Sequence, residues 1–165
     1  MQILYGGAFN PPTIAHYQII KFLIKKYPKS KLIILPTNNS YKQDNIIDFH
    51  HRVKMLEILI RDLKNNIEIS DYELKQDKFV GTYYTLKHFN HPYFVIGADQ
   101  LASLSTWIKY PDVIIENNFI VFPRNNIDIS NIIANNNILN NYKNHFTIVD
   151  FEEINISSSM FPEGH

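Results

Sequence analysis

Residues 5–16 read YGGAFNPPTIAH and join two apolar segments of different periodicity. Residues 2–5 predict a short buried strand, whereas residues 14–26 carry apolar side chains at helical spacing with lysines on the other face. Two glycines permit close backbone approach, and two prolines stiffen the connection. A helix that begins near Thr13 directs its first N–H groups at one point, where an anion, typically phosphate, is favoured. His16 follows three residues later, so both side chains can face one pocket.

A plainer interpretation stays open on spacing alone. The same stretch is consistent with an ordinary strand-to-helix turn in which Thr13 caps the helix and His16 packs against it. The stretch is neither GxGxxG nor a P-loop, because no GK[ST] follows the glycines.

Strand patterns alternate with helix patterns along the whole chain. This order predicts an α/β fold that is Rossmann-like and doubly wound, with a mostly parallel sheet and helices on both faces. Ligands of such sheets bind beyond the carboxyl ends of the strands. We expect strands at residues 2–5, 31–35, 67–70, 93–96, 119–122 and 146–149, and helices at 14–26, 48–60 (capped by Asp48), 82–89, 101–115 (broken by Pro111) and 127–133.

The composition excludes several classes of function. The chain has 165 residues, and its 16 Lys+Arg balance its 16 Asp+Glu, so a basic nucleic-acid-binding surface is not expected. It has no cysteine, which excludes disulfides and thiol catalysis. Its apolar runs are far shorter than the roughly 20 residues of a membrane span. No signal peptide is recognised, so we expect a cytoplasmic protein without membrane contacts.

The end of the chain resembles the start of a purification tag. We expect one domain over residues 1–162, with Glu163, Gly164 and His165 as a tag remnant. On this interpretation the natural chain continues, and a fused C-terminal domain is one form that it could take.

The stretch GGAFNPPTIAH (residues 6–16) resembles the (H/T)xGH signature of the nucleotidylyltransferase superfamily. Thr13 takes the place of the leading His, and Ala15 that of the Gly. The form GG-x-F-N-P-P is similar to the nicotinate-nucleotide adenylyltransferase branch in particular. The resemblance continues in order through LPTNNSYK, FHHRVKML, GTYYTL, FVIGADQLASLSTW, VFPR and ISSSMF, although Pro162 stands where the family's last motif has an Arg.

The resemblance implies a transfer of AMP from ATP to nicotinate mononucleotide, which gives deamido-NAD and pyrophosphate. It implies catalytic roles for His16, Thr13 and Lys42. It implies ATP binding by Gly6, Gly7, Ala8, Phe9, Gly97, Asp99, Ser157, Ser158 and Ser159. It implies binding of the second substrate by Asn10, Arg52, Thr82, Thr85, Trp107 and Arg124. We expect Mg²⁺ to be held mainly by the ATP phosphates, with no protein metal ligand.

Two alternatives remain at this point. One is a nucleotidylyltransferase with another phosphate-bearing substrate, and the other is a nucleotide-binding module with impaired catalysis. Trp107, the Thr82 segment and the Asn-Pro-Pro form argue against the first, whereas Ala15 and Pro162 favour the second. The choice between nicotinate and nicotinamide mononucleotide stays open, as does a homo-oligomeric state.

Overall fold

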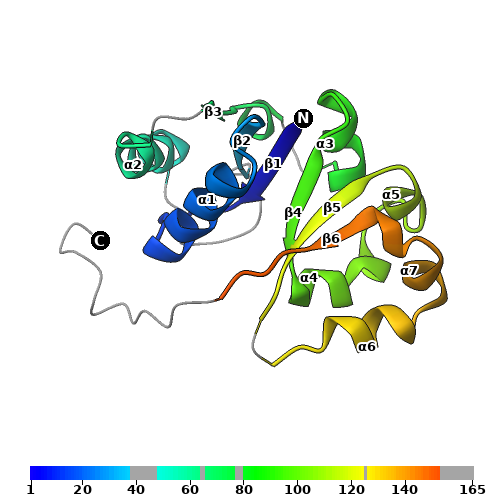
Figure 1. Ribbon diagram of the computed structural model, residues 1–165. Helices are drawn as coiled ribbons and strands as arrows, with labels where there is room; N and C mark the ends of the chain where they lie inside the picture. Colours follow the sequence, from blue (N-terminus) through cyan, green and yellow to red (C-terminus); the bar gives the residue numbers. More distant parts are fainter. Residues whose placement is uncertain (38–47, 64–65, 77–79, 125, 153–165) are drawn as a thin grey trace. The chain divides into compact units, whose positions relative to one another are not determined.

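A computed structural model of the chain describes residues 1–37, 48–63, 66–76, 80–124 and 126–152. The chain divides into two compact units, which meet in sequence between Phe79 and Val80. Each unit has its own parallel strands and its own helices (Figure 1). Among the described residues, none of the helices has the length and hydropathy that a membrane crossing requires.

The N-terminal unit holds three strands in the order β3-β2-β1. β2 and β3 pair in parallel, with Leu32 opposite Ile67. The N–H of Lys31 donates to Met1 O and that of Thr37 to Gly7 O; because both bonds span the same sequence offset, β1 and β2 also run in parallel. The elements of this unit are β1 (Gln2–Gly7), α1 (Ile14–Lys26), β2 (Lys31–Pro36), α2 (Phe49–Ile60), β3 (Ile67–Ile69) and a 3₁₀ turn (Glu73–Lys75).

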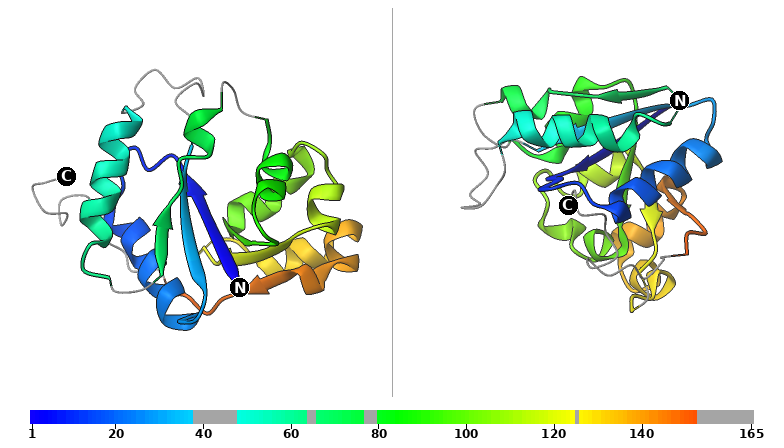
Figure 2. Two further views of the ribbon diagram at one scale, coloured as in Figure 1. Left: turned by 90° about the horizontal axis from the view of Figure 1, so that it is seen from above. Right: turned by 90° about the vertical axis from the view of Figure 1, so that its left-hand side faces the viewer.

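The helices α1 and α2 are the crossovers between these parallel strands. Both lie on the same side of the strands in the left view of Figure 2, as expected when successive right-handed crossovers move along a sheet in one direction. The apolar stripe of α1 buries Ile20, Leu23 and Ile24. The carboxyl ends of β1 and β2 are thus held by a continuous core, and the loops that leave them carry the candidate residues of this unit.

The C-terminal unit holds three further strands in the order β4-β5-β6. β5 pairs in parallel with both neighbours, and its residues Phe119, Ile120 and Val121 are completely buried, as expected for a central strand. Helix α4 contacts β4, β5 and α6, and α3 contacts α5. The elements are α3 (Thr82–His88), β4 (Tyr93–Gly97), α4 (Ala98–Ala102), a 3₁₀ turn (Leu104–Thr106), α5 (Asp112–Ile115), β5 (Asn118–Phe122), α6 (Ile129–Ala134), α7 (Asn137–Asn141), a 3₁₀ turn (Lys143–His145) and β6 (Phe146–Ile148).

The sequence predictions were right about the type of most elements and wrong about several boundaries. Gly6 and Gly7 belong to β1 and not to a turn after it. The helix expected over residues 101–115 is two short helices, α4 and α5, joined by a 3₁₀ turn and a connecting segment. Helix α7, in an Asn-rich segment with little apolar periodicity, was not predicted.

Candidate active site

Thr13 and His16 form the N-terminal cap of α1. The Thr13 N–H donates to His16 Nδ1 at 2.8 Å, and the His16 N–H donates to Thr13 Oγ1 at 3.4 Å. This reciprocal arrangement is a capping box, in which His16 occupies the position usually held by Glu or Gln. The plainer interpretation of the sequence, a capped turn, therefore describes the local structure correctly. A cap does not exclude a further role for either side chain.

The cap fixes the tautomer of His16. A backbone N–H only donates, so Nδ1 must carry a lone pair, and in the neutral ring the proton sits on Nε2. The Nε2 atom has no hydrogen-bond partner among the described residues. Burial lowers the pKa of His16 from 6.5 to about 4. At neutral pH the side chain is an uncharged ring that offers one N–H donor.

Phe9 supplies much of the apolar surface around His16. Its ring is 1% exposed, and its centroid lies 4.9 Å from that of His16 and 5.4 Å from that of Tyr5, edge-on in both cases. Phe9 has a positive φ of 47°, which is uncommon for a residue with a side chain. The ring of Phe9 is thus a packing element of the loop, and the prediction that this residue binds ATP stays a prediction.

Arg52 lies on α2 and is completely buried. Its Nη1 donates to Ala8 O at 2.8 Å and its Nη2 to Thr37 O at 3.0 Å. Burial lowers the pKa of Arg52, and the Asp48 carboxylate partly offsets this effect. The predicted substrate contact of Arg52 stays a prediction; in the structure its side chain is inside the unit and donates to Ala8 and Thr37, the residues that follow β1 and β2.

In the C-terminal unit, the predicted ATP-binding residues Gly97 and Asp99 lie where β4 gives way to α4. Gln100 Oε1 accepts the Gly97 N–H at 2.9 Å, so Gln100, and not Asp99, caps this end of α4. Asp99 is exposed, and a Cβ added to Gly97 would lie 2.8 Å from Asp99 Oδ1. The glycine therefore keeps room for the Asp99 carboxylate.

The predicted substrate-binding segment at α3 packs against the segment that carries Trp107. Gly81, with a φ of +107°, caps α3, and a Cβ built on it would lie 2.9 Å from Ile108 Cδ1. Thr82, the first residue of α3, is half-buried. Thr85 is only 2% exposed, and its predicted substrate contact stays a prediction. Trp107 is partly exposed, with its ring edge-on to that of Phe94 at 6.2 Å.

The remaining predicted residues have simpler positions. The end of β1 and the segment that leads to α1 hold four partly exposed residues, Gly6, Gly7, Ala8 and Asn10. Arg124 is exposed just after β5. Four of the predicted residues lie outside the part of the chain that the structure describes: Lys42, Ser157, Ser158 and Ser159.

Three residues of these segments were not among the predicted site residues. The carbonyl of Thr37 accepts a hydrogen bond from Arg52 Nη2. Gln100 caps α4, and the side chain of Ile108 covers Gly81. Gln100 had a readable signal, because Gln three residues after a cap position is the capping-box spacing. The other two act through a carbonyl and through a packing contact, for which the sequence has no signature.

Known proteins match this chain over most of its length. The family model described as cytidylyltransferase-like matches residues 4–163. The chain belongs to the cytidylyltransferase-like family. A protein from Acholeplasma laidlawii named "Probable nicotinate-nucleotide adenylyltransferase" is 43% identical over 132 residues, which are 76% of this chain and 69% of that protein. A protein of the same name from Fusobacterium nucleatum is 34% identical over 164 residues, 94% of this chain and 82% of the relative. The family predicted from the motifs is thus confirmed.

Solved structures of the family confirm the fold. The Plasmodium falciparum nicotinic acid mononucleotide adenylyltransferase complexed with NaAD matches with a TM-score of 0.77 and 22% identity. The match covers 96% of this chain and 80% of that one. The same enzyme complexed with APC matches with a TM-score of 0.72. The predicted Rossmann-like α/β class is therefore correct.

Proposed function

We propose that this chain transfers the adenylyl group of ATP to nicotinate mononucleotide and releases deamido-NAD and pyrophosphate. The observation that carries the proposal is the His16 side chain, whose Nδ1 is held by the Thr13 N–H, so that the only remaining donor is Nε2–H. Its place at the start of α1, in a family of nucleotidylyltransferases, matches a reaction at phosphate oxygens.

The reaction needs alignment and charge stabilisation more than covalent chemistry. A phosphate oxygen of the mononucleotide forms a bond to the α-phosphorus of ATP, and the bond from that phosphorus to the bridging oxygen breaks as pyrophosphate leaves. Negative charge shifts onto the leaving oxygens during this step. An Nε2–H donor fixed in place before the reaction stabilises that charge without reorganisation.

The low pKa of His16 gives the side chain its proposed role. Without bound substrate, a ring with a pKa of about 4 is neutral at neutral pH, and we propose that His16 acts as a hydrogen-bond donor to phosphate oxygens. Positive charge then has to come from elsewhere. We propose that Lys42 supplies part of it, as the family resemblance implies.

Mg²⁺ remains part of the proposal. Among the described residues, no three His, Cys, Asp or Glu side chains gather into a metal site. We propose that ATP phosphate oxygens and water hold the ion, which neutralises phosphate charge. For the mononucleotide, we propose contacts with Trp107 and Thr82, both of which have exposed surface.

The test is pyrophosphate release from ATP and Mg²⁺ with nicotinate mononucleotide, nicotinamide mononucleotide and phosphopantetheine in parallel. We expect release with a pyridine mononucleotide and a loss in H16A of about 10²–10³-fold in kcat, the usual effect of removing one such donor. In H16N, the Asn oxygen replaces Nδ1 as the cap acceptor while the Nε2–H donor is lost. H16N should therefore fold normally and still be impaired.

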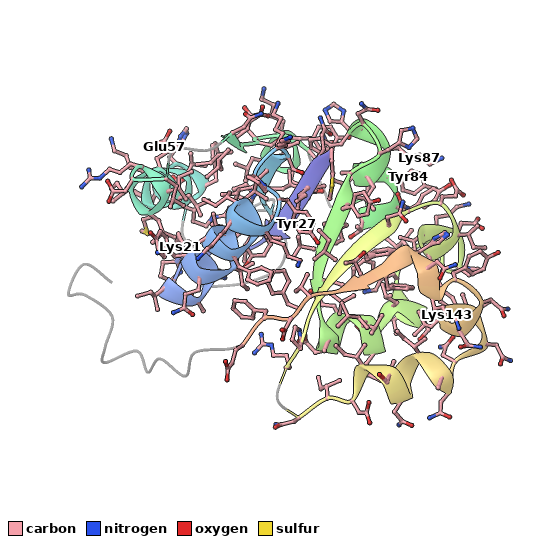
Figure 3. The ribbon with its side chains drawn as sticks, in the orientation of Figure 1. Lys21, Tyr27, Glu57, Tyr84, Lys87 and Lys143 are labelled. Atoms are coloured by element: carbon pink, nitrogen blue, oxygen red, sulfur yellow. The ribbon has the colours of Figure 1, made fainter. Side chains whose placement is uncertain are left out.

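The controls separate the alternatives. K21A changes an exposed residue of α1 that points away from the strands (Figure 3) and should leave kcat unchanged. Pyrophosphate release only with phosphopantetheine would indicate a nucleotidylyltransferase that uses another phosphate-bearing substrate. ATP binding without release from any of the three would contradict the proposal and favour a binding module.

A further inference from the structure

We propose that Arg52 is a positioning residue, which holds Ala8, the residue after β1, and Thr37, the residue after β2, in one arrangement from inside the N-terminal unit. This inference rests on the proposed function for its catalytic consequence, but not for its structural content. Two of its hydrogen bonds reach Ala8, 44 positions earlier in the chain, and Thr37, 15 positions earlier. Few side chains can connect two such distant loops, because this requires two donors in a rigid fork.

The helix that carries Arg52 is well anchored. The Asp48 carboxylate caps α2 by accepting the His50 N–H at 3.0 Å. Leu56, one turn after Arg52 on the same face, is also completely buried. The Arg52 guanidinium therefore extends from a well-anchored helix to the carbonyls of Ala8 and Thr37.

The carbonyls of Ala8 and Thr37, to which Arg52 donates, lie directly after β1 and β2. Ala8 stands between Gly7, the last residue of β1, and Phe9, whose ring packs on His16. Thr37 directly follows β2, and its N–H donates to Gly7 O at 2.9 Å. Arg52, Thr37 and Gly7 thus link the end of β2 to the start of the loop that orients His16.

Burial argues against a direct substrate contact for Arg52. The side chain is 0% exposed, and two of its N–H groups are already directed at main-chain carbonyls. A buried guanidinium stays protonated, and main-chain carbonyl dipoles stabilise its charge. The arrangement serves to hold the loops.

The test compares R52K and R52M with E57Q, which changes an exposed residue of the same helix (Figure 3). Lys keeps the stem and the charge but has no fork, so it cannot bond both carbonyls in the same geometry. We expect R52K to lower kcat by about 10- to 100-fold, the cost of a small misplacement of catalytic groups, with KM for both substrates within about threefold. E57Q should match the wild type.

Hydrogen exchange provides a readout that does not depend on activity. In R52K and R52M, the amides of Thr13 and Thr37 should both exchange faster, because each bonds within the arrangement that Arg52 holds. L56V should destabilise α2 without faster exchange at both Thr13 and Thr37. It is therefore the control for a non-specific loss of stability. Millimolar guanidinium added to R52A should restore part of kcat.

The outcomes are distinct. Unchanged exchange at Thr13 and Thr37, together with a raised KM and an intact kcat in R52K, would overturn the inference and make Arg52 a substrate ligand. If the wild-type protein released no pyrophosphate, the proposed function would fail, while the exchange data would still decide the role of Arg52.

Discussion

At the scale of single residues, His16 combines two tasks that are usually separate. Its Nδ1 completes the cap of α1, and its Nε2–H is the donor that we assign to the reaction. The cap sets the tautomer, and the Phe9 ring contributes to the burial that keeps the ring neutral. A substitution of His16 is therefore expected to affect both the cap and the proposed donor.

The low pKa of His16 predicts a specific dependence of stability on pH. The unfolded chain binds this proton near pH 6.5 and the folded chain near pH 4, so between these values the unfolded state binds more protons and acid favours unfolding. The contribution of His16 is complete above pH 6.5 and is lost as the pH falls towards 4, in total about 3 kcal/mol. Urea unfolding of the wild type and of H16N from pH 4 to 8 isolates this term. If the difference in free energy of unfolding stayed constant across that range, His16 would not be buried as a neutral ring.

At the scale of elements, Gly81 decides how α3 meets the segment with Trp107. An Ala at a φ of +107° is strained in itself, and its Cβ would also lie 2.9 Å from Ile108 Cδ1. We expect G81A to lower the free energy of unfolding by about 2–4 kcal/mol. KM for the mononucleotide should rise more than KM for ATP, since Thr82 follows Gly81 directly.

The double variant G81A/I108A separates the two causes. Removing the Ile108 side chain relieves the contact but not the backbone strain, so stability should recover only in part. Full recovery would assign the whole effect to packing, and a loss below about 0.5 kcal/mol in G81A itself would refute the argument. Thermal unfolding and substrate kinetics on the four proteins of this cycle provide the data.

The elements also show what the sequence could predict. Helix α1 and its Thr13 cap were predicted correctly, because apolar period, cap residue and the following Pro28 all agree. Gly6 and Gly7 were expected in a turn, but neither has a positive φ, and both continue the strand. The role of Arg52 could not be predicted, because a buried Arg and an exposed one look the same in a helical pattern and its partners are carbonyls far along the chain.

At the scale of the whole molecule, charge provides little help in binding an anionic substrate. The formal net charge is zero, so no overall positive field attracts ATP. Affinity has to come from local donors, and a ligand that binds only the folded state stabilises that state. The stability of the whole chain should therefore report on binding even where catalysis has been removed.

Ligand binding should raise the thermal midpoint of unfolding of the intact chain. A ligand at 100 times its Kd stabilises the folded state by about 2.7 kcal/mol. For a chain of 165 residues this corresponds to a shift of about 5–10 °C. We expect deamido-NAD to produce the full shift in the wild type and most of it in H16N, because the lost donor acts chiefly on charge that develops during the reaction. Differential scanning fluorimetry with phosphopantetheine as the control ligand tests this. A shift abolished in H16N would mean that His16 contributes mainly to binding in the ground state, and its role would then be to hold the nucleotide.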